Sequence, residues 1–398
     1  MKKAYIIGTC DTKYAELKFV QQRIEQAGLS TNLVDVGTLT HDFEVDISAK
    51  AVANHHPNRT DFLAKNEGRG DAVIAMSEAL EQFLVTQRDI AGVIGLGGSG
   101  GTSLISKGLR ALPVGLPKIM VSTVASGNTA PYVGASDIFM LYSITDIAGI
   151  NQISNTILGN AANALVGMIQ QSIPDYQVTK PAVGMTMFGV TTACVTQIRA
   201  AIEKDYDCLV FHATGTGGQS MEKLIDSGFI TKVLDMTTTE VCDLHAGGIM
   251  SAGEDRMGAI IRQKIPYIGS VGALDMVNFG ALATVPEKYK NRNLYVHNSE
   301  VTLMRTNVAE NKVMGKWIAH KLNQMEAPVR FFIPEKGVSA LSVAGQPFYN
   351  AAADKALFDT LEKEVIQTEN RQLIRLPFAI NDAAFSEEVV KVFRLLHA

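Results

Sequence analysis

The stretch Gly95-Leu-Gly-Gly-Ser-Gly-Gly-Thr102 decides the fold class of this chain. It follows the apolar segment Gly92-Val-Ile and precedes Leu104, Ile105 and Leu109, which are spaced as on one face of a helix. A strand, a glycine turn and a helix in this order direct unpaired backbone N–H groups and the positive end of a helix dipole at an anion. The stretch therefore predicts an α/β fold with a cradle for phosphate.

A shorter glycine run, Thr214-Gly-Thr-Gly-Gly218, occurs in the second half of the chain, again between an apolar segment and a helical pattern. The turns Gly8-Thr-Cys-Asp-Thr-Lys13 and Gly189-Val-Thr-Thr192 form a second matching pair. Duplication of a Rossmann-like unit explains both pairs. The alternative is chance similarity, because glycine turns are common in α/β proteins.

The chain has 398 residues, which is too long for one compact core and fits two domains. We expect two Rossmann-like domains with mainly parallel sheets and a glycine-rich loop in each, over residues 1–180 and 181–398. Residues 354–398 are expected to form a helical tail with two amphipathic helices. The apolar runs predict strands near residues 4–8, 32–36, 92–96, 118–122, 138–141, 183–188, 208–213, 232–235, 266–271, 294–297 and 329–333.

Composition excludes several classes of protein. Hydrophobic residues make up 46% and charged residues 19%, which is typical of a globular chain and not of a disordered one. A net charge of −4 without a long basic run argues against nucleic-acid binding. No signal peptide or membrane-spanning segment is recognisable, and the four cysteines have no zinc spacing. We expect a cytoplasmic protein.

The glycine pattern does not by itself identify the ligand. Gly95, Gly97 and Gly100 satisfy G-x-G-x-x-G, but a dinucleotide site also needs an acid about 20 residues further on, and none lies between Asp89 and Asp137. The second run has Asp235 at about that distance, so NAD is disfavoured but not excluded. A P-loop is excluded because its lysine is missing. The phosphate charge would be balanced by Mg²⁺ or by a basic residue, such as Lys13 or Arg305.

Loops after three predicted strands supply the candidate site. The residues expected to hold the ligand are Thr9, Asp11, Thr12, Lys13, Gly95, Gly97, Gly98, Ser99, Gly100, Gly101, Thr102, Ser122, Ser126 and Asn128. His212, His245 and His297 are candidates for acid–base chemistry, although a histidine at a strand end is more often structural. No signature of a nucleophile or a catalytic metal site is present, so catalytic residues stay unassigned.

Seven motifs carry a resemblance over nearly the whole chain. They are Gly8–Lys13, Gly95–Thr102, Val121–Thr129, Phe211–Gly218, Leu234–Glu240, Val271–Gly280 and His297–Thr306. Together they resemble an uncharacterised microbial family related to the N-terminal region of the tomato mosaic virus resistance protein. The resemblance implies two Rossmann-like domains, ATP-type nucleotide binding and a homodimer. In the plant relative a domain resembling a TIM barrel follows, which suggests a separate partner subunit of that kind here.

The function expected from the sequence is binding of ATP or a related phosphate ligand, with the reaction left open. One alternative is a small-molecule enzyme, either a dehydrogenase that uses Asp235 or a transferase or hydrolase with its site between the domains. The other is a non-catalytic regulatory or partner subunit.

Overall fold

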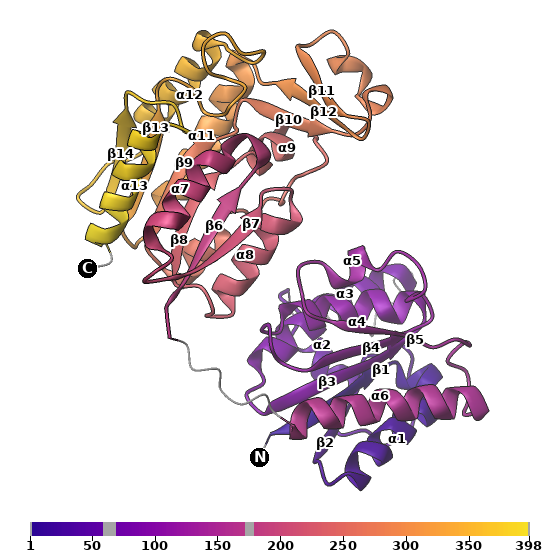
Figure 1. Cartoon of the computed structure of the whole chain (residues 1–398). Coiled ribbons are helices and arrows are strands. Elements are labelled where there is room, and N and C mark those ends of the chain that lie inside the picture. Colours follow the sequence, from indigo (N-terminus) through magenta and orange to yellow (C-terminus); the bar gives the residue numbers. More distant parts are fainter. Residues whose placement is uncertain (1, 59–68, 172–178, 397–398) are drawn as a thin grey trace. The chain divides into compact units, whose positions relative to one another are not determined.

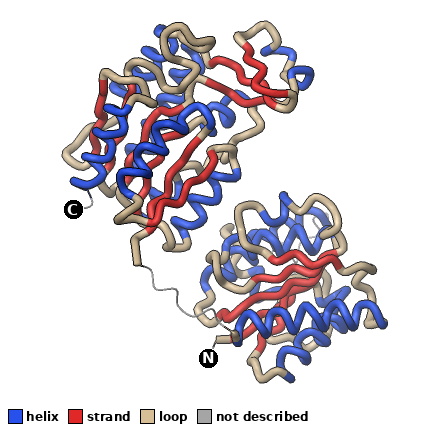
Figure 2. The backbone as a smooth tube through the Cα atoms, in the orientation of Figure 1, coloured by secondary structure: helices blue, strands red, loops and turns tan. Residues whose placement is uncertain are grey.

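A computed structural model of the chain describes residues 2–58, 69–171 and 179–396. The chain divides into two compact units, Met1–Tyr176 and Gln177–Ala398 (Figure 1). Each unit contains a layer of strands between layers of helices (Figure 2). The helices of the described ranges are all too short or too polar to cross a lipid bilayer.

The first unit is built on a five-stranded parallel sheet with the order β2-β1-β3-β4-β5. Its strands are β1 (Lys3–Gly8), β2 (Thr31–Asp35), β3 (Ile90–Gly97), β4 (Lys118–Ser122) and β5 (Phe139–Tyr142). Its helices are α1 (Cys10–Gln26), α2 (Ala49–Ala53), α3 (Arg69–Thr86), α4 (Ser99–Ala111), α5 (Ala130–Val133) and α6 (Gln152–Gln170). The central strands are almost wholly apolar because helices cover both faces of the sheet.

Local sequence explains where the helices of this unit begin and end. Gly28 follows α1 with a φ of +84°, a left-handed conformation that glycine adopts without strain. At the start of α6, Asn151 Oδ1 accepts from the Ser154 N–H, and Ser154 Oγ accepts from the Asn151 N–H. Helices α1 and α6 pack on one face of the sheet, and α3 and α4 pack on the other.

The second unit has a six-stranded parallel sheet with the order β14-β13-β9-β8-β6-β7. Its strands are β6 (Ala182–Met187), β7 (Asp207–His212), β8 (Lys232–Thr237), β9 (Tyr267–Gly272), β13 (Val329–Pro334) and β14 (Arg371–Leu376). Its α-helices are α7 (Thr192–Ile202), α8 (Thr216–Asp226), α9 (Glu240–Ala246), α10 (Gly258–Gln263), α11 (Val308–Gln324), α12 (Ala351–Glu364) and α13 (Ala383–Leu396). The prediction of an α/β fold with two Rossmann-like domains and mainly parallel sheets is therefore confirmed.

Two details of the second unit differ from the prediction. The expected strand near 294–297 is β11 (Leu294–Asn298), which pairs antiparallel with β12 (Val301–Arg305) in a small sheet that also contains β10 (Met276–Phe279). The expected helical tail contains α12 and α13, but the segment between them is the edge strand β14. Because β14 follows β13 in sheet order, the tail completes the second unit's own sheet.

The sheet orders also correct the interpretation of the two glycine runs. Each unit's first strand lies between its second and third strands, since β1 lies between β2 and β3, and β6 lies between β7 and β8. The first glycine run follows a third strand, β3, whereas the second follows a second strand, β7. The two glycine runs are therefore not topological counterparts. The first turns of the two units, which follow β1 and β6, occupy equivalent positions in the two sheets.

Candidate functional site

The first unit has a topological switch point between β1 and β3. The chain leaves β1 toward β2 on one side and later leaves β3 toward β4 on the other, so the two loops diverge at the carboxyl ends of adjacent strands. Open α/β sheets bind ligands in the crevice at this point. The loop Gly8–Lys13 and the loop Gly97–Thr102 both start here, so the structure brings two predicted segments to one edge.

The start of α4 presents unpaired backbone donors. Gly98 is the extended N-cap residue, and Thr102 N–H is the first amide of the helix to donate, to Gly98 O at 2.8 Å. Within the described ranges, the N–H groups of Ser99, Gly100 and Gly101 donate to no protein acceptor. Ser99 and Gly100 are exposed. Three unpaired amides and the positive end of a 13-residue helix thus lie at the switch point, and two of these amides belong to exposed residues.

The other glycines and hydroxyls of this run hold the cradle in shape. A Cβ on Gly95 would lie 2.7 Å from the side chain of Ile105, so this glycine permits close packing of α4 on the sheet. A Cβ on Gly97 would lie 2.6 Å from Thr102 N. The Thr102 hydroxyl is buried and lies 2.6 Å from the equally buried Ser122 hydroxyl, which links α4 to β4. Their burial corrects the expectation that Thr102 and Ser122 face the ligand.

The start of α1 forms the other side of the switch point. Thr9 Oγ1 and Thr12 Oγ1 are 2.8 Å apart. Lys13 Nζ donates to Ile147 O at 2.6 Å, which leaves its other N–H groups available. Asp11 Oδ2 accepts from the Leu39 N–H at 3.3 Å, while Asp11 Oδ1 is shielded from solvent and has no hydrogen-bond partner in the described part of the chain.

Asp35 is a residue of this edge that the sequence analysis did not single out. It ends β2, is buried, and accepts from the Cys10 N–H at 3.0 Å and the Gly37 N–H at 2.8 Å. His41 Nε2 lies 2.9 Å from its second oxygen. Burial and the neighbouring Asp35 carboxylate raise the pKa of the Cys10 thiol, so Cys10 is not a ready nucleophile. Its position at the end of a predicted strand is the feature of the sequence from which Asp35 could have been selected as a candidate.

The loop after β4 reaches the cradle through its first residues only. Thr123 N–H donates to Gly97 O at 3.3 Å, which joins this loop to the glycine run. Asn128 Oδ1 accepts from the N–H of Ala130, the first residue of α5. Ser126 and Asn128 are exposed, and neither forms a hydrogen bond with the glycine run within the part of the chain that the structure describes. Their role as ligand contacts stays a prediction.

The second glycine run is already occupied by a carboxylate of the chain itself. Glu240 Oε1 accepts from the Gly215 N–H at 2.8 Å and the Gly218 N–H at 3.0 Å. A Cβ on Gly218 would lie 2.2 Å from Glu240 Oε2, so glycine is required for this approach. The second run therefore caps a helix with an internal anion and is not an open phosphate cradle, a point that the sequence alone left open.

Asp235 is equally unavailable to a ribose. It is fully buried and accepts from Arg256 Nη2 at 2.7 Å, Tyr267 Oη at 2.8 Å and Thr186 Oγ1 at 2.6 Å. Arg256 also contacts Glu240 and Glu222. The alternative of a dehydrogenase that uses Asp235 is therefore wrong, because both carboxylate oxygens of Asp235 already accept hydrogen bonds within a buried ion network.

Arg305 does not match its predicted role either. Its Nη2 donates to Asp354 Oδ1 at 2.5 Å and its Nε to Phe348 O at 2.6 Å, both within the second unit. Only 4% of its surface is exposed, so it cannot balance a ligand's charge in the first unit.

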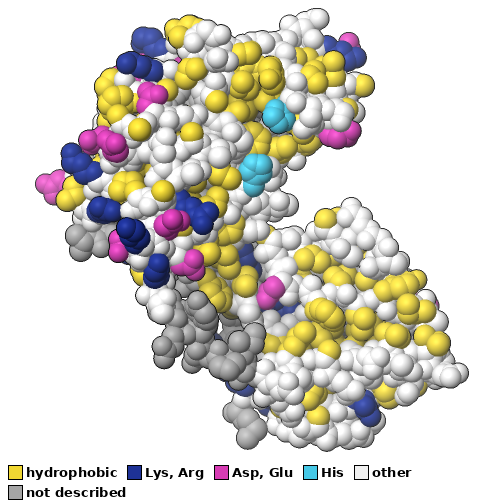
Figure 3. Space-filling model, viewed as in Figure 1, with side chains coloured by type: hydrophobic (Ala, Val, Ile, Leu, Met, Phe, Trp, Pro, Cys, Tyr) yellow, Lys and Arg dark blue, Asp and Glu magenta, His cyan; other side chains and the backbone are white. Residues whose placement is uncertain are grey.

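Histidine side chains lie on the surface of the second unit (Figure 3), and His212, His245 and His297 are all exposed. His212 stacks on Phe188 at 5.3 Å, so the structure gives it a packing partner but no carboxylate.

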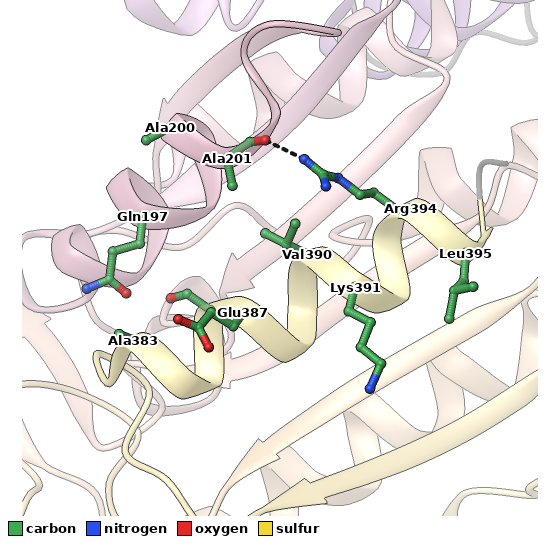
Figure 4. Close-up of a pocket in the computed structure, with 10 residues that line it drawn as sticks. Gln197, Ala200, Ala201, Ala383, Glu387, Val390, Lys391, Arg394 and Leu395 are labelled. Atoms are coloured by element: carbon green, nitrogen blue, oxygen red, sulfur yellow. Dashed lines mark hydrogen bonds between the residues drawn. The ribbon is translucent and has the colours of Figure 1, made fainter.

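A groove of about 970 Å³ lies between α7 and α13 of the second unit (Figure 4). Its floor contains Ala200, Ala201 and Val390, and Arg394 closes one side by donating to Ala201 O at 2.8 Å. Its lining also includes Ser386, Glu387 and Lys391 of α13, but no hydrogen bond or ion pair joins these three side chains to one another among the described residues, so we assign no chemistry to this depression between two helices. In the part of the chain that is described, no three His, Cys, Asp or Glu side chains are grouped to hold a metal ion.

Comparisons with known proteins agree with the resemblance read from the motifs. The model of the N-terminal domain of the uncharacterised protein family UPF0261 matches residues 2–174, and that of its C-terminal domain matches residues 180–397. A UPF0261 protein of Rhizobium meliloti is 54% identical over 394 residues, with 99% of each chain covered. One of Clostridium tetani is 48% identical, with 98% of each chain covered. The ToMV resistance protein Tm-1(GCR237) of Solanum lycopersicum is 43% identical over 98% of this chain and 55% of its own length.

Proposed function

The chain belongs to the UPF0261 family, and we propose that its first unit binds the phosphate groups of ATP or a related nucleotide at the β1/β3 switch point. One observation carries the proposal. The amides of Ser99, Gly100 and Gly101 have no protein acceptor among the described residues, and Ser99 and Gly100 are exposed, whereas the Gly215 and Gly218 amides of the second glycine run donate to Glu240. The chain thus fills one helix terminus with its own carboxylate and leaves the other for an external anion.

The neighbouring side chains suit a phosphate accompanied by a cation. Thr9 and Thr12 offer hydroxyls, and Lys13 offers a positive charge that is only partly used. The shielded, unpartnered Asp11 Oδ1 is a hard oxygen ligand of the type Mg²⁺ prefers. When bound, Mg²⁺ would neutralise part of the phosphate charge. Asp11 would hold it directly or through water, while the backbone amides orient the phosphate oxygens.

The family resemblance supports two further proposals, a homodimer and a separate partner subunit of the TIM-barrel type. The composition of the sequence is the basis of a third proposal, a cytoplasmic location. The tomato relative is named for virus resistance, and 45% of its length lies outside the match because the match covers 55% of it. Light scattering of the purified protein tests the dimer, and affinity purification from a native cell lysate tests the partner.

Calorimetry with Mg-ATP on Gly100 variants tests the nucleotide proposal. A side chain at Gly100 meets no atom within 4 Å, so substitution there leaves the fold intact. Gly100→Asp places a carboxylate where the phosphate would lie, and a negative charge in the first turn also stabilises the helix. We expect it to weaken Mg-ATP binding more than about tenfold. Gly100→Ala, which adds a methyl group without charge, should retain affinity within about twofold.

Two outcomes would refute the proposal. One is equal affinity of the wild type and Gly100→Asp for Mg-ATP. The other is the absence of any heat of binding for the wild type at millimolar Mg-ATP. Thermal shifts with NAD(H) and NADP(H) provide the comparison, because the ligand with the highest affinity raises the unfolding temperature most at equal concentration.

A further inference from the structure

The segment that follows β5 contains a strained turn. Thr145 N–H donates to Ser143 O at 2.7 Å, which closes a three-residue γ-turn around Ile144. Ile144 has a φ of +64°, a conformation that β-branched residues rarely adopt. Its side chain is 57% exposed, so the burial of this side chain does not offset the free energy of the strained backbone. Strained residues of this kind concentrate at ligand clamps and switch regions.

Hydrogen bonds join this segment to the candidate phosphate site on two sides. Ser143 N–H donates to Ser122 O at 3.2 Å, and the next residue of that loop, Thr123, donates to Gly97 O. At the other end, Ile147 O accepts from Lys13 Nζ. Segment 143–147 therefore borders the switch point between the loop after β4 and the start of α1.

The same segment carries a polar atom without a partner. Thr145 Oγ1 is shielded from solvent and has no hydrogen-bond partner among residues 2–58, 69–171 and 179–396. Among the described residues of the first unit, two other side-chain atoms share this condition, Asp11 Oδ1 and Ser136 Oγ. Thr145 and Asp11 both lie at the carboxyl edge of the sheet. A shielded polar atom without a protein partner costs free energy, and a bound ligand is one source of the contacts that these two atoms lack.

We propose that segment 143–147 is the nucleoside-binding wall of the candidate site, with Ile144 packing against the base and the Thr145 hydroxyl bonded to a polar group of the nucleoside. This assignment rests on the proposed function, because the phosphates must be held at the start of α4 for the nucleoside to reach Ile144. If the site prefers a nucleotide to a polyphosphate without a nucleoside, this assignment attributes the preference to Ile144 and Thr145, which lie outside the glycine run.

The test compares Mg-ATP with Mg-tripolyphosphate by calorimetry. Thr145→Val keeps the shape of the side chain and removes only the hydroxyl. We expect it to weaken ATP binding about tenfold and to leave tripolyphosphate binding unchanged. Ile144→Asn keeps a residue that tolerates positive φ, removes the apolar side chain, and should have the same selective effect. Thr302→Val is the matched control, because Thr302 Oγ1 is also shielded and unpartnered but lies in β12 of the second unit.

The outcomes separate this inference from the proposed function. Selective loss of ATP affinity in both variants, with unfolding temperatures no lower than that of the wild type, supports it. Wild-type ATP affinity in either variant overturns it, as does equal affinity of the wild-type protein for ATP and tripolyphosphate, although the phosphate site then stands. If the wild type binds neither ligand, the proposed function fails and this inference falls with it.

Discussion

Replacement of Arg256 by methionine tests the buried ion network most directly. Arg256 is 2% exposed and contacts three carboxylates, with N–O distances of 2.7 Å to Asp235, 2.8 Å to Glu240 and 3.2 Å to Glu222. Burial raises the pKa of both glutamates, and the Arg256 charge opposes this rise. Methionine fills similar space without charge, so the variant leaves three carboxylates buried without a cation.

We expect Arg256→Met to lower the free energy of unfolding of the second unit by about 3–5 kcal/mol at neutral pH. That is a large part of the roughly 5–15 kcal/mol that stabilises a typical domain. Without Arg256 the pKa of each buried glutamate rises further in the folded state. The folded variant therefore takes up protons more readily than its unfolded state, and its deficit should shrink as the pH is lowered toward 5.

Urea unfolding followed by fluorescence measures this change. Trp317 is the single tryptophan of the chain and lies in α11 of the second unit, so its emission reports that unit. Arg262→Met is the control, because Arg262 pairs with Asp226 and Asp255 at the surface, and its loss should cost less than about 1 kcal/mol. Equal destabilisation by the two substitutions would refute the buried-network reasoning.

Two further predictions concern single positions. Burial raises the pKa of Asp243 from 3.8 to about 7 despite its bond to Asn278, so the folded state favours the protonated acid. The contribution of Asp243 to the free energy of unfolding is therefore present at low pH and is lost as the pH rises through 7. In urea titrations between pH 4 and 7, the wild type should lose up to about 4 kcal/mol of this free energy relative to Asp243→Asn. Parallel curves of the free energy of unfolding against pH for the two proteins would contradict this. Gly97→Ala should lower the unfolding temperature, because its Cβ would lie 2.6 Å from Thr102 N, while Gly100→Ala should not; equal temperatures in calorimetric scans would contradict the packing argument.

Local patterns in the sequence predicted most of the individual elements. Apolar runs marked β1, β4 and β6, and the first glycine run marked the start of α4. These patterns did not predict whether a strand pairs parallel or antiparallel with its neighbour. The apolar run at β11 looks like any other strand, because the choice between a parallel and an antiparallel partner depends on where the chain goes next.

The candidate site shows the same division. The sequence indicated the loops after β1 and β3, and strand order makes these loops neighbours. It could not distinguish the open glycine run from the occupied one, because Glu240 reaches the second run from 25 residues away in sequence. It also gave no reason to select Thr145, whose missing partner is visible only once its surroundings are packed.

The sequence by itself determined the fold class, the family and the glycine turns that begin two helices, because strand and helix patterns and backbone freedom are properties of short segments. Only the tertiary structure decided which helix terminus is free to bind an anion. That choice depends on which side chains from distant segments reach the backbone amides: a carboxylate reaches the start of α8, and no protein acceptor within the described residues reaches the first amides of α4.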